Sequence, residues 1–253
     1  MTVVANERPS VLATIAHELR TPLSALETAS ELLERDFELL DEQQIRTIVS
    51  GIHRRTLWMR SLMENLFTSV AIREGRLRIV PRPIDVVDTV REVESIVRPL
   101  LVRKQQTLSI VAPPTYSLVE GDEHRISQVL LNLLSNANKY ADAGTVIEVA
   151  VAMRRGGAVR VSVSDHGPGL PAGATRRAFR AYDRAGRVGG EGLGIGLWVV
   201  ASIVQAHGGR VGTYNRASGG ATFWFELRPM NAAPNAKSVG VENMSLIQHV
   251  DVV

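Results

Sequence analysis

Large apolar side chains recur every seven residues between positions 45 and 66, and this spacing limits what the N-terminal part of the chain can form. The repeat consists of Ile45, Ile52, Met59 and Leu66. Such a repeat is typical of a coiled-coil seam on one helix. A first helical pattern begins near residue 10, and a polar break at about 36–43 separates the two, so we expect a helical hairpin. Because one hairpin cannot cover the seam, the pattern favours a homodimer in which two hairpins form a four-helix bundle.

The character of the chain changes after residues 73–83, a stretch that holds Gly75, Pro81 and Pro83 and is the predicted linker. Residues 1–72 then form a first domain, 84–229 form a second, and the tail 230–253 stays unassigned. Helical stretches of the second domain lie at about 85–103, 122–140 and 192–207, and strand-like runs lie at 108–111, 146–152, 159–164, 210–213 and 221–227. Because the two types do not alternate strictly, we expect an α+β sandwich, a mixed sheet with helices on one face.

Composition narrows the class of protein. The chain of 253 residues has no cysteine, which excludes disulfides and thiol chemistry and makes a reducing, cytoplasmic location the expectation. Its longest apolar run, 197–204, is far shorter than the roughly 20 residues that cross a bilayer, so no membrane span is expected. The balance of 29 basic and 26 acidic residues is too even to indicate a nucleic-acid partner.

A histidine on the first predicted helix is a candidate nucleophile. The apolar residues around it cluster in one direction, and His17 points about 140° away from them, towards solvent. Thr21 follows one turn later on the same face, and Glu18 flanks the histidine. A neutral imidazole is a competent nucleophile when a neighbour takes its proton, and Glu18 is the candidate for that role. A solvated helix face that happens to carry these residues is the alternative.

The predicted helix at 122–140 carries polar groups suited to a nucleotide. Asn132 and Asn136 lie one turn apart on one face, and an amide oxygen suits Mg²⁺. Lys139 offers a charge for phosphate, and Tyr140 a flat surface for a base or sugar. Asparagines that only cap or solvate the helix are the alternative.

A second group of candidates follows the predicted strand 159–164. The carboxylate of Asp165 can accept a hydrogen bond from the exocyclic amine of adenine, which guanine lacks at that position. Gly167 and Gly169 allow the backbone to pass close to a ligand. An ordinary turn that begins at an aspartate is the alternative.

A third group lies at the start of the last predicted helix. Gly192, Gly194 and Gly196, followed by Leu197, expose backbone N–H groups at a helix N-terminus, where phosphate is favoured. No Gly-Lys-Ser/Thr occurs, which excludes a Walker-type loop, and a preceding polar loop makes a dinucleotide fingerprint a poor match. That loop is rich in arginine and predicts a lid in which a residue such as Arg184 meets the γ-phosphate. A solvated basic loop is the alternative.

Together these segments resemble the histidine kinases of two-component signalling over about residues 11–228. Residues 17–23 resemble the phosphoacceptor box of the family, 122–140 its N box, 165–169 its G1 motif, 179–184 its F box and 192–197 its G2 motif. The resemblance implies a dimerisation and phosphotransfer hairpin followed by an ATP-binding domain of the GHKL type. It departs from the common pattern at His166, where a small or amide residue is frequent, and at Tyr182, where Phe is frequent.

The resemblance also implies roles. His17 would be the phosphoacceptor, Glu18 its proton acceptor, and Thr21 the group that positions water for dephosphorylation of a partner. Asn136 would bind Mg²⁺ with support from Asn132. ATP would be held by Lys139, Tyr140, Asp165, Gly167, Gly169, Gly194 and Gly196.

The sequence therefore predicts an ATP-dependent, autophosphorylating histidine kinase. It would pass the phosphoryl group from His17 to an aspartate of a response regulator receiver domain and could also act as a phosphatase of that regulator. A catalytically silent ATP-binding dimeric scaffold is the alternative. An ATPase of the mismatch-repair or chaperone type is disfavoured, because those proteins lack a His-Glu-x-x-Thr-Pro hairpin ahead of the ATP domain.

Overall fold

The computed structural model describes residues 11–114, 117–181, 183 and 193–230, without the side chains of residues 11–14 and 17. The chain divides into two compact units, and the boundary between them falls after Phe67, inside a long helix. The first unit contains most of the N-terminal hairpin, and the second contains the last turns of that long helix and both sheets. The linker placed at residues 73–83 stays a prediction.

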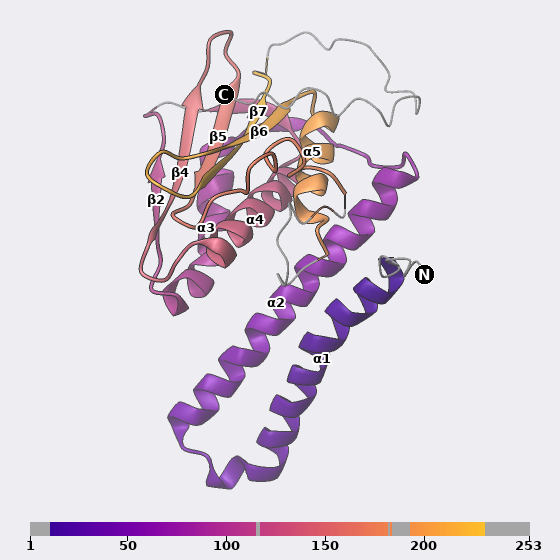
Figure 1. The fold of residues 1–253 in the computed structure, drawn as a ribbon, viewed down its shortest axis with the longest axis vertical. Coiled ribbons are helices and arrows are strands. Elements are labelled where there is room, and N and C mark those ends of the chain that lie inside the picture. Colours follow the sequence, from indigo (N-terminus) through magenta and orange to yellow (C-terminus); the bar gives the residue numbers. More distant parts are fainter. Residues whose placement is uncertain (1–10, 115–116, 182, 184–192, 231–253) are drawn as a thin grey trace, which may run out of the picture. The chain divides into compact units, whose positions relative to one another are not determined.

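The hairpin consists of α1 (Val11–Asp36), a short 3-10 helix η1 (Phe37–Leu39) and α2 (Glu42–Arg73) (Figure 1). The turn between the helices is closed by a reciprocal pair of bonds at the start of α2. The backbone N–H of Gln44 donates to Asp41 Oδ1 at 2.7 Å, and the N–H of Asp41 donates to Gln44 Oε1 at 2.9 Å. This is a capping box, which satisfies N–H groups that the first turn leaves without partners. The helical hairpin predicted from the sequence is confirmed.

The second unit contains a two-stranded and a five-stranded sheet. Its elements are β1 (Arg82–Asp85), α3 (Val86–Arg103), β2 (Thr107–Val111), β3 (Leu118–Gly121), α4 (Glu123–Tyr140), β4 (Val146–Met153), β5 (Val159–Ser164), α5 (Gly196–Ala206), β6 (Arg210–Asn215) and β7 (Ala221–Leu227). The small sheet pairs β1 with β3, and the large sheet has the order β2-β4-β5-β7-β6. Only β2 and β4 are parallel in the large sheet, so it is mixed.

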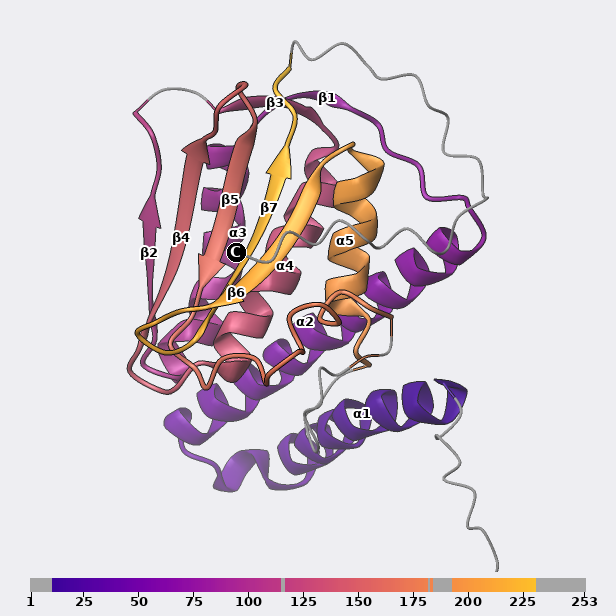
Figure 2. The same ribbon diagram turned by 45° about the horizontal axis from the view of Figure 1, so that its top comes forward.

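Helices α3, α4 and α5 cover one face of the large sheet, and α4 contacts the other two (Figures 1 and 2). The alternation along β5 shows why. Val159, Val161 and Val163 are buried towards the helices, whereas Arg160, Ser162 and Ser164 are only partly buried. Because side chains alternate between the two faces of a strand, β5 presents an apolar face to the helices and a polar face away from them. The predicted α+β sandwich is confirmed.

The small sheet is the part of the fold that the sequence pattern does not predict. Arg82–Asp85 overlaps the predicted linker, and Leu118–Gly121 lies between the predicted elements. Each strand has four residues, and their pairing is antiparallel, Arg82 with Gly121 through Asp85 with Leu118. Four residues show too few alternations to distinguish a strand from a loop, and Pro83 further weakens the strand signal.

Candidate functional site

The predicted nucleophile lies on α1. His17 belongs to this helix, but its side chain is outside the described part of the structure. The neighbouring Glu18 is buried, whereas Thr21 is exposed. Pro22 lies inside the helix, where it removes one backbone donor directly after this segment. The two catalytic candidates whose side chains are described therefore differ in their access to solvent.

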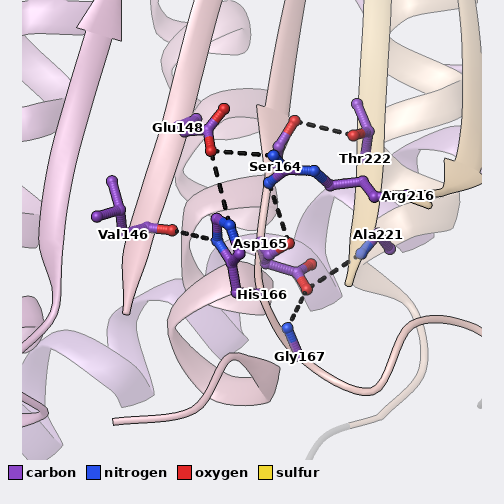
Figure 3. Close-up of polar contacts among 9 residues, drawn as sticks. All are labelled: Val146, Glu148, Ser164, Asp165, His166, Gly167, Arg216, Ala221 and Thr222. Atoms are coloured by element: carbon purple, nitrogen blue, oxygen red, sulfur yellow. Dashed lines mark hydrogen bonds and ion pairs between the residues drawn. The ribbon is translucent and has the colours of Figure 1, made fainter. Parts of the chain in front are cut away.

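The Asp165 carboxylate is buried and held by backbone donors. It follows β5 on the side that faces the helices, and 5 % of its surface is exposed. Its Oδ1 accepts hydrogen bonds from the N–H of Gly167 at 2.9 Å and from the N–H of Ala221 at 3.2 Å (Figure 3). Within the described residues, both bonds to this carboxylate end on Oδ1. Oδ2 is therefore the oxygen that can accept a bond from a ligand.

Gly167 brings the loop after β5 against the end of α4. A Cβ at this position would lie 2.5 Å from the backbone oxygen of Tyr140, so a larger residue would push the loop away from the helix. Two residues further on, Gly169 has a φ of 70°. The close approach places the predicted adenine-selecting loop next to Tyr140, one of the predicted ATP contacts.

Asn215 is a site residue that the sequence analysis missed. Its amide nitrogen donates to the carbonyl of Leu170 at 2.8 Å, and its Oδ1 accepts from the N–H of the same residue at 2.8 Å. The side chain of Asn215, at the end of β6, thus fixes the backbone of Leu170 in the loop after β5. A single asparagine at a strand end carries no sequence signal for such a clamp, because 45 residues separate the two partners.

The remaining predicted residues lie on α4 and at the start of α5, and these two helices are in contact. Asn132 is buried on α4, and a Cβ on Gly196 would lie 3.4 Å from its Oδ1. Asn136 and Leu197 are partly buried. Lys139 and Tyr140 end the helix, with the ammonium 5.0 Å from the centre of the Tyr140 ring.

Gly194, two residues before Gly196, has a φ of 68°. Arg184 and Gly192 lie outside the described residues, as does Tyr182. The structure therefore brings together the predicted residues of α4, of the loop after β5 and of the start of α5.

The C-terminal end of α4 is fastened by a lysine that the sequence analysis did not select. Lys104 Nζ donates to the backbone carbonyls of Asn138, Lys139 and Ala141 at 2.7, 3.0 and 3.1 Å. Gln106 adds bonds from its amide to the carbonyl of Ala141 at 3.2 Å and to that of Asp142 at 3.0 Å. These contacts fix the segment that carries the predicted phosphate and base contacts of α4.

The opposite end of α4 is joined to α5 through a histidine. His207 Nε2 accepts the N–H of Asp122, the N-cap of α4, at 2.9 Å, and His207 Nδ1 lies 2.8 Å from the carbonyl of Ile203. A carbonyl can only accept, so Nδ1 carries the proton and the imidazole is neutral. Burial lowers the pKa of His207, although the bond to Ile203 and the charge of Asp122 act in the opposite direction.

This arrangement predicts that the protein loses stability when His207 is protonated. A histidine whose pKa is lowered by folding stabilises the protein fully above its unfolded pKa of about 6.5, and this contribution is lost as the pH falls through the folded pKa. Urea unfolding at pH 7.5 and pH 5 measures the loss. The amide of His207→Gln can accept the same N–H but does not titrate. We therefore expect the difference in the free energy of unfolding between pH 7.5 and pH 5 to be smaller in His207→Gln than in the wild type by about 1 kcal/mol, the scale of one hydrogen bond.

The control is His124→Gln, which makes the same change at an exposed position of α4. It should keep the pH dependence of the wild type. Equal pH dependence in His207→Gln and the wild type would show that His207 does not link the two helices through its neutral form.

Two kinds of feature are absent from the described residues. No helix in the described ranges is long and apolar enough to cross a bilayer. The same ranges contain no cluster of three or more His, Cys, Asp or Glu side chains that could hold a metal ion.

Comparison with known proteins gives the class and then the family. Residues 8–75 match the His Kinase A (phospho-acceptor) domain, and residues 121–231 match the histidine kinase-, DNA gyrase B- and HSP90-like ATPase. The class is thus a phosphoacceptor domain joined to a nucleotide-binding domain of this ATPase type. The sensor protein KdpD of Clostridium acetobutylicum is 31% identical over 87% of the chain, and the adaptive-response sensory kinase SasA of Thermosynechococcus vestitus is 33% identical over 86%. The chain belongs to the two-component histidine kinases and contains their catalytic core.

The chain spans only part of these relatives, 24% of KdpD and 59% of SasA. Solved structures agree with the fold. Full-length ShkA in complex with AMPPNP aligns with a TM-score of 0.61 at 30% identity, over 89% of this chain and 47% of that one. The catalytic domain of histidine kinase ThkA aligns with a TM-score of 0.53 at 25% identity, over 60% of this chain and 98% of that one.

Proposed function

We propose that the chain is an ATP-dependent kinase that phosphorylates its own His17 and passes the phosphoryl group to an aspartate of a response regulator receiver domain. The observation that carries this proposal is the restrained carboxylate of Asp165, whose two backbone donors both occupy Oδ1 and leave Oδ2 to a ligand. A buried carboxylate held by two backbone N–H groups is suited to accept a hydrogen bond from the exocyclic amine of adenine. The phosphoacceptor motif in the same chain provides the nucleophile.

The reaction is a phosphoryl transfer. A ring nitrogen of His17 forms a bond to the γ-phosphorus of ATP, the bond to the β,γ-bridging oxygen breaks, and ADP leaves. Glu18 takes the proton that the imidazole loses. Mg²⁺, bound through Asn136 and the phosphates, would offset the negative charge of the phosphates. Lys139 would contact a phosphate, and Arg184 would contact the γ-phosphate.

Several further residues complete the proposed ATP site. Tyr140 would lie against the base or the sugar, and Asn132 would support Asn136. The backbone contacts to the nucleotide would come from Gly167, Gly169, Gly192, Gly194, Gly196 and Leu197.

The test is incubation with Mg-ATP labelled in its γ-phosphate. A label that is lost in acid and retained in base identifies a phosphoramidate, because the P–N bond hydrolyses readily once its nitrogen is protonated. A chain that binds ATP but takes up no label would instead be a catalytically silent dimeric scaffold. This outcome would favour the alternative function that the sequence leaves open.

We also propose that the hairpin forms a homodimer. The repeat residues of α2 are only partly covered by their own hairpin, and apolar side chains nearby are exposed, Val49 by 50% and Met63 by 42%. A second copy would bury this surface and close a four-helix bundle. A solved relative, histidine kinase ThkA in complex with the response regulator protein TrrA, supports a response regulator as the second partner.

Thr21 is expected to separate two activities of the proposed enzyme. Autophosphorylation needs a nucleophile, a base and ATP, whereas hydrolysis of a phosphoaspartate on the regulator needs a positioned water molecule. An exposed hydroxyl one turn after His17 can hold that water. Thr21→Ala should therefore keep autophosphorylation and slow dephosphorylation of the regulator by about 100-fold, the scale of a lost positioning contact. Both rates are measured with the same regulator.

Thr28→Ala is the control, because it makes the same change at another exposed threonine of α1, about two turns further from His17. It should change neither rate. If Thr21→Ala lowers both rates together, Thr21 serves the helix or a shared docking surface and not the water.

A further inference from the structure

The pairing of β4 with β5 stops directly before Asp165. Its last pair is Glu148 with Ser164, and the same register continued by two residues would place Val146 opposite His166. At that point the contact with β4 is made by the side chain of His166 and not by its backbone: Nδ1 lies 2.9 Å from the carbonyl oxygen of Val146 (Figure 3). The carbonyl can only accept, so Nδ1–H is the donor. The imidazole thus keeps the chain bonded to β4 beyond the last backbone pair.

The outer side of the same imidazole faces a charged pair. His166 Nε2 lies 3.8 Å from Glu148 Oε1, and the guanidinium of Arg216 donates to the same oxygen at 3.0 Å. Arg216 also donates to the backbone carbonyl of Asp165 at 3.4 Å. Figure 3 shows these side chains together at the end of the sheet. Arg216 follows β6 and reaches Glu148 of β4, so the contacts cross β7 and β5.

These contacts converge on the peptide units that orient the Asp165 carboxylate. Arg216 fixes the carbonyl of Asp165, and His166 fixes the residue that links it to Gly167, whose N–H donates to Oδ1. On the remaining side, a Cβ on Gly220 would lie 1.9 Å from the Asp165 carbonyl oxygen, so the segment before β7 already packs closely there. A shift of His166 would therefore move a donor that sets the direction of Oδ2.

The three side chains are partly exposed, with 33% for His166, 43% for Glu148 and 20% for Arg216. Ion pairs with this much exposure contribute little to folding stability. Their effect is therefore expected in the orientation of the loop and not in the stability of the domain.

We propose that His166, Glu148 and Arg216 form a brace that positions Asp165 for the exocyclic amine of adenine, and that the brace thereby determines how strongly the protein prefers adenine. The three are positioning residues. The proposal rests on the proposed function, in which Asp165 binds the base of ATP. It assigns a role to His166, which the family resemblance marks only as a departure from the common residue.

The experiment compares two nucleotides by calorimetry on the full chain. ATP carries the 6-amino group, whereas purine riboside 5′-triphosphate lacks it and is otherwise the same. His166→Ala and Arg216→Ala should each raise the Kd for ATP by about 3- to 10-fold, the scale of one hydrogen bond. Neither should change the Kd for the analogue by more than about twofold, because the analogue makes no bond to Asp165.

Two further variants serve as rescue and control. His166→Asn places an amide N–H near the position of Nδ1, so it can donate to Val146 and should keep the Kd for ATP within about twofold of the wild type. Arg98→Ala removes a surface ion pair of similar length, the 2.7 Å contact of Arg98 with Glu94 on α3, and should change neither Kd.

The outcomes separate the brace from the proposed function. Equal losses for both nucleotides in His166→Ala would overturn the brace, because they would show a general loosening of the site. An unchanged preference for ATP in His166→Ala and Arg216→Ala, with the preference lost in Asp165→Asn, would also overturn it while leaving the proposed function in place. A wild type with no preference for ATP over the analogue would contradict the adenine contact itself.

Discussion

Replacing His17 with glutamine is expected to abolish the phosphorylation of the protein by Mg-ATP. Glutamine has no ring nitrogen that can form a bond to phosphorus. The reaction therefore has no nucleophile in this variant, and it should stop completely and not merely become slower. Nucleotide binding should persist, because the proposed ATP contacts lie on α4, on the loop after β5 and at the start of α5. The measurements are the acid-labile label per chain and the Kd for ATP by calorimetry.

The matched control is His53→Gln, which makes the same change at a histidine of α2. It should take up label as the wild type does. Label that persists in His17→Gln with the same lability in acid would move the acceptor to another histidine. Loss of both label and ATP binding would indicate damage to the fold and would call for the same test with His17→Ala.

Asp165→Asn is expected to weaken ATP binding by about 10- to 100-fold, the scale of a hydrogen bond to a charged group. Both backbone donors to this carboxylate end on Oδ1. An asparagine must therefore keep its oxygen at that position, because the alternative turns an NH₂ group towards two N–H groups. Its NH₂ then takes the place of Oδ2 and faces the amine of adenine, so an acceptor is replaced by a donor.

Calorimetry with ATP tests this expectation, with Asp88→Asn as the control. Asp88 is an exposed aspartate on α3, and its ion pair with Arg91 stays within that helix. Its variant should bind ATP as the wild type does. Equal affinity of Asp165→Asn and the wild type would mean that Asp165 only closes a turn.

The main elements of the fold could be predicted because their signals are local. The heptad repeat indicates α2, and the alternation in residues 159–164 indicates β5, since each pattern depends only on neighbouring residues. The segments around Asn136, Asp165 and Gly196 could be selected for the same reason, because each has a composition suited to one part of a nucleotide. The structure then shows that these three segments lie together.

The missed features depend on contacts between distant residues. Lys104 reaches the end of α4 across 34 or more positions, and Arg216 reaches Glu148 across 68. Neither residue stands in a pattern that distinguishes it from a solvated charge, so no local rule could select it. The pairing of β1 with β3 escaped prediction for a related reason, because two four-residue strands become recognisable only when both are seen side by side.

The contact of Lys104 with α4 also changes the electrostatics of that helix. The C-terminal carbonyls of a helix together carry the equivalent of about half a negative charge, which disfavours an anion nearby. The positive charge of Lys104, which contacts two of these carbonyls and that of the C-cap residue Ala141, offsets it. A helix C-terminus ordinarily repels a polyanion. At the end of α4 that carries Lys139 and Tyr140, the charge of Lys104 removes this repulsion for a triphosphate.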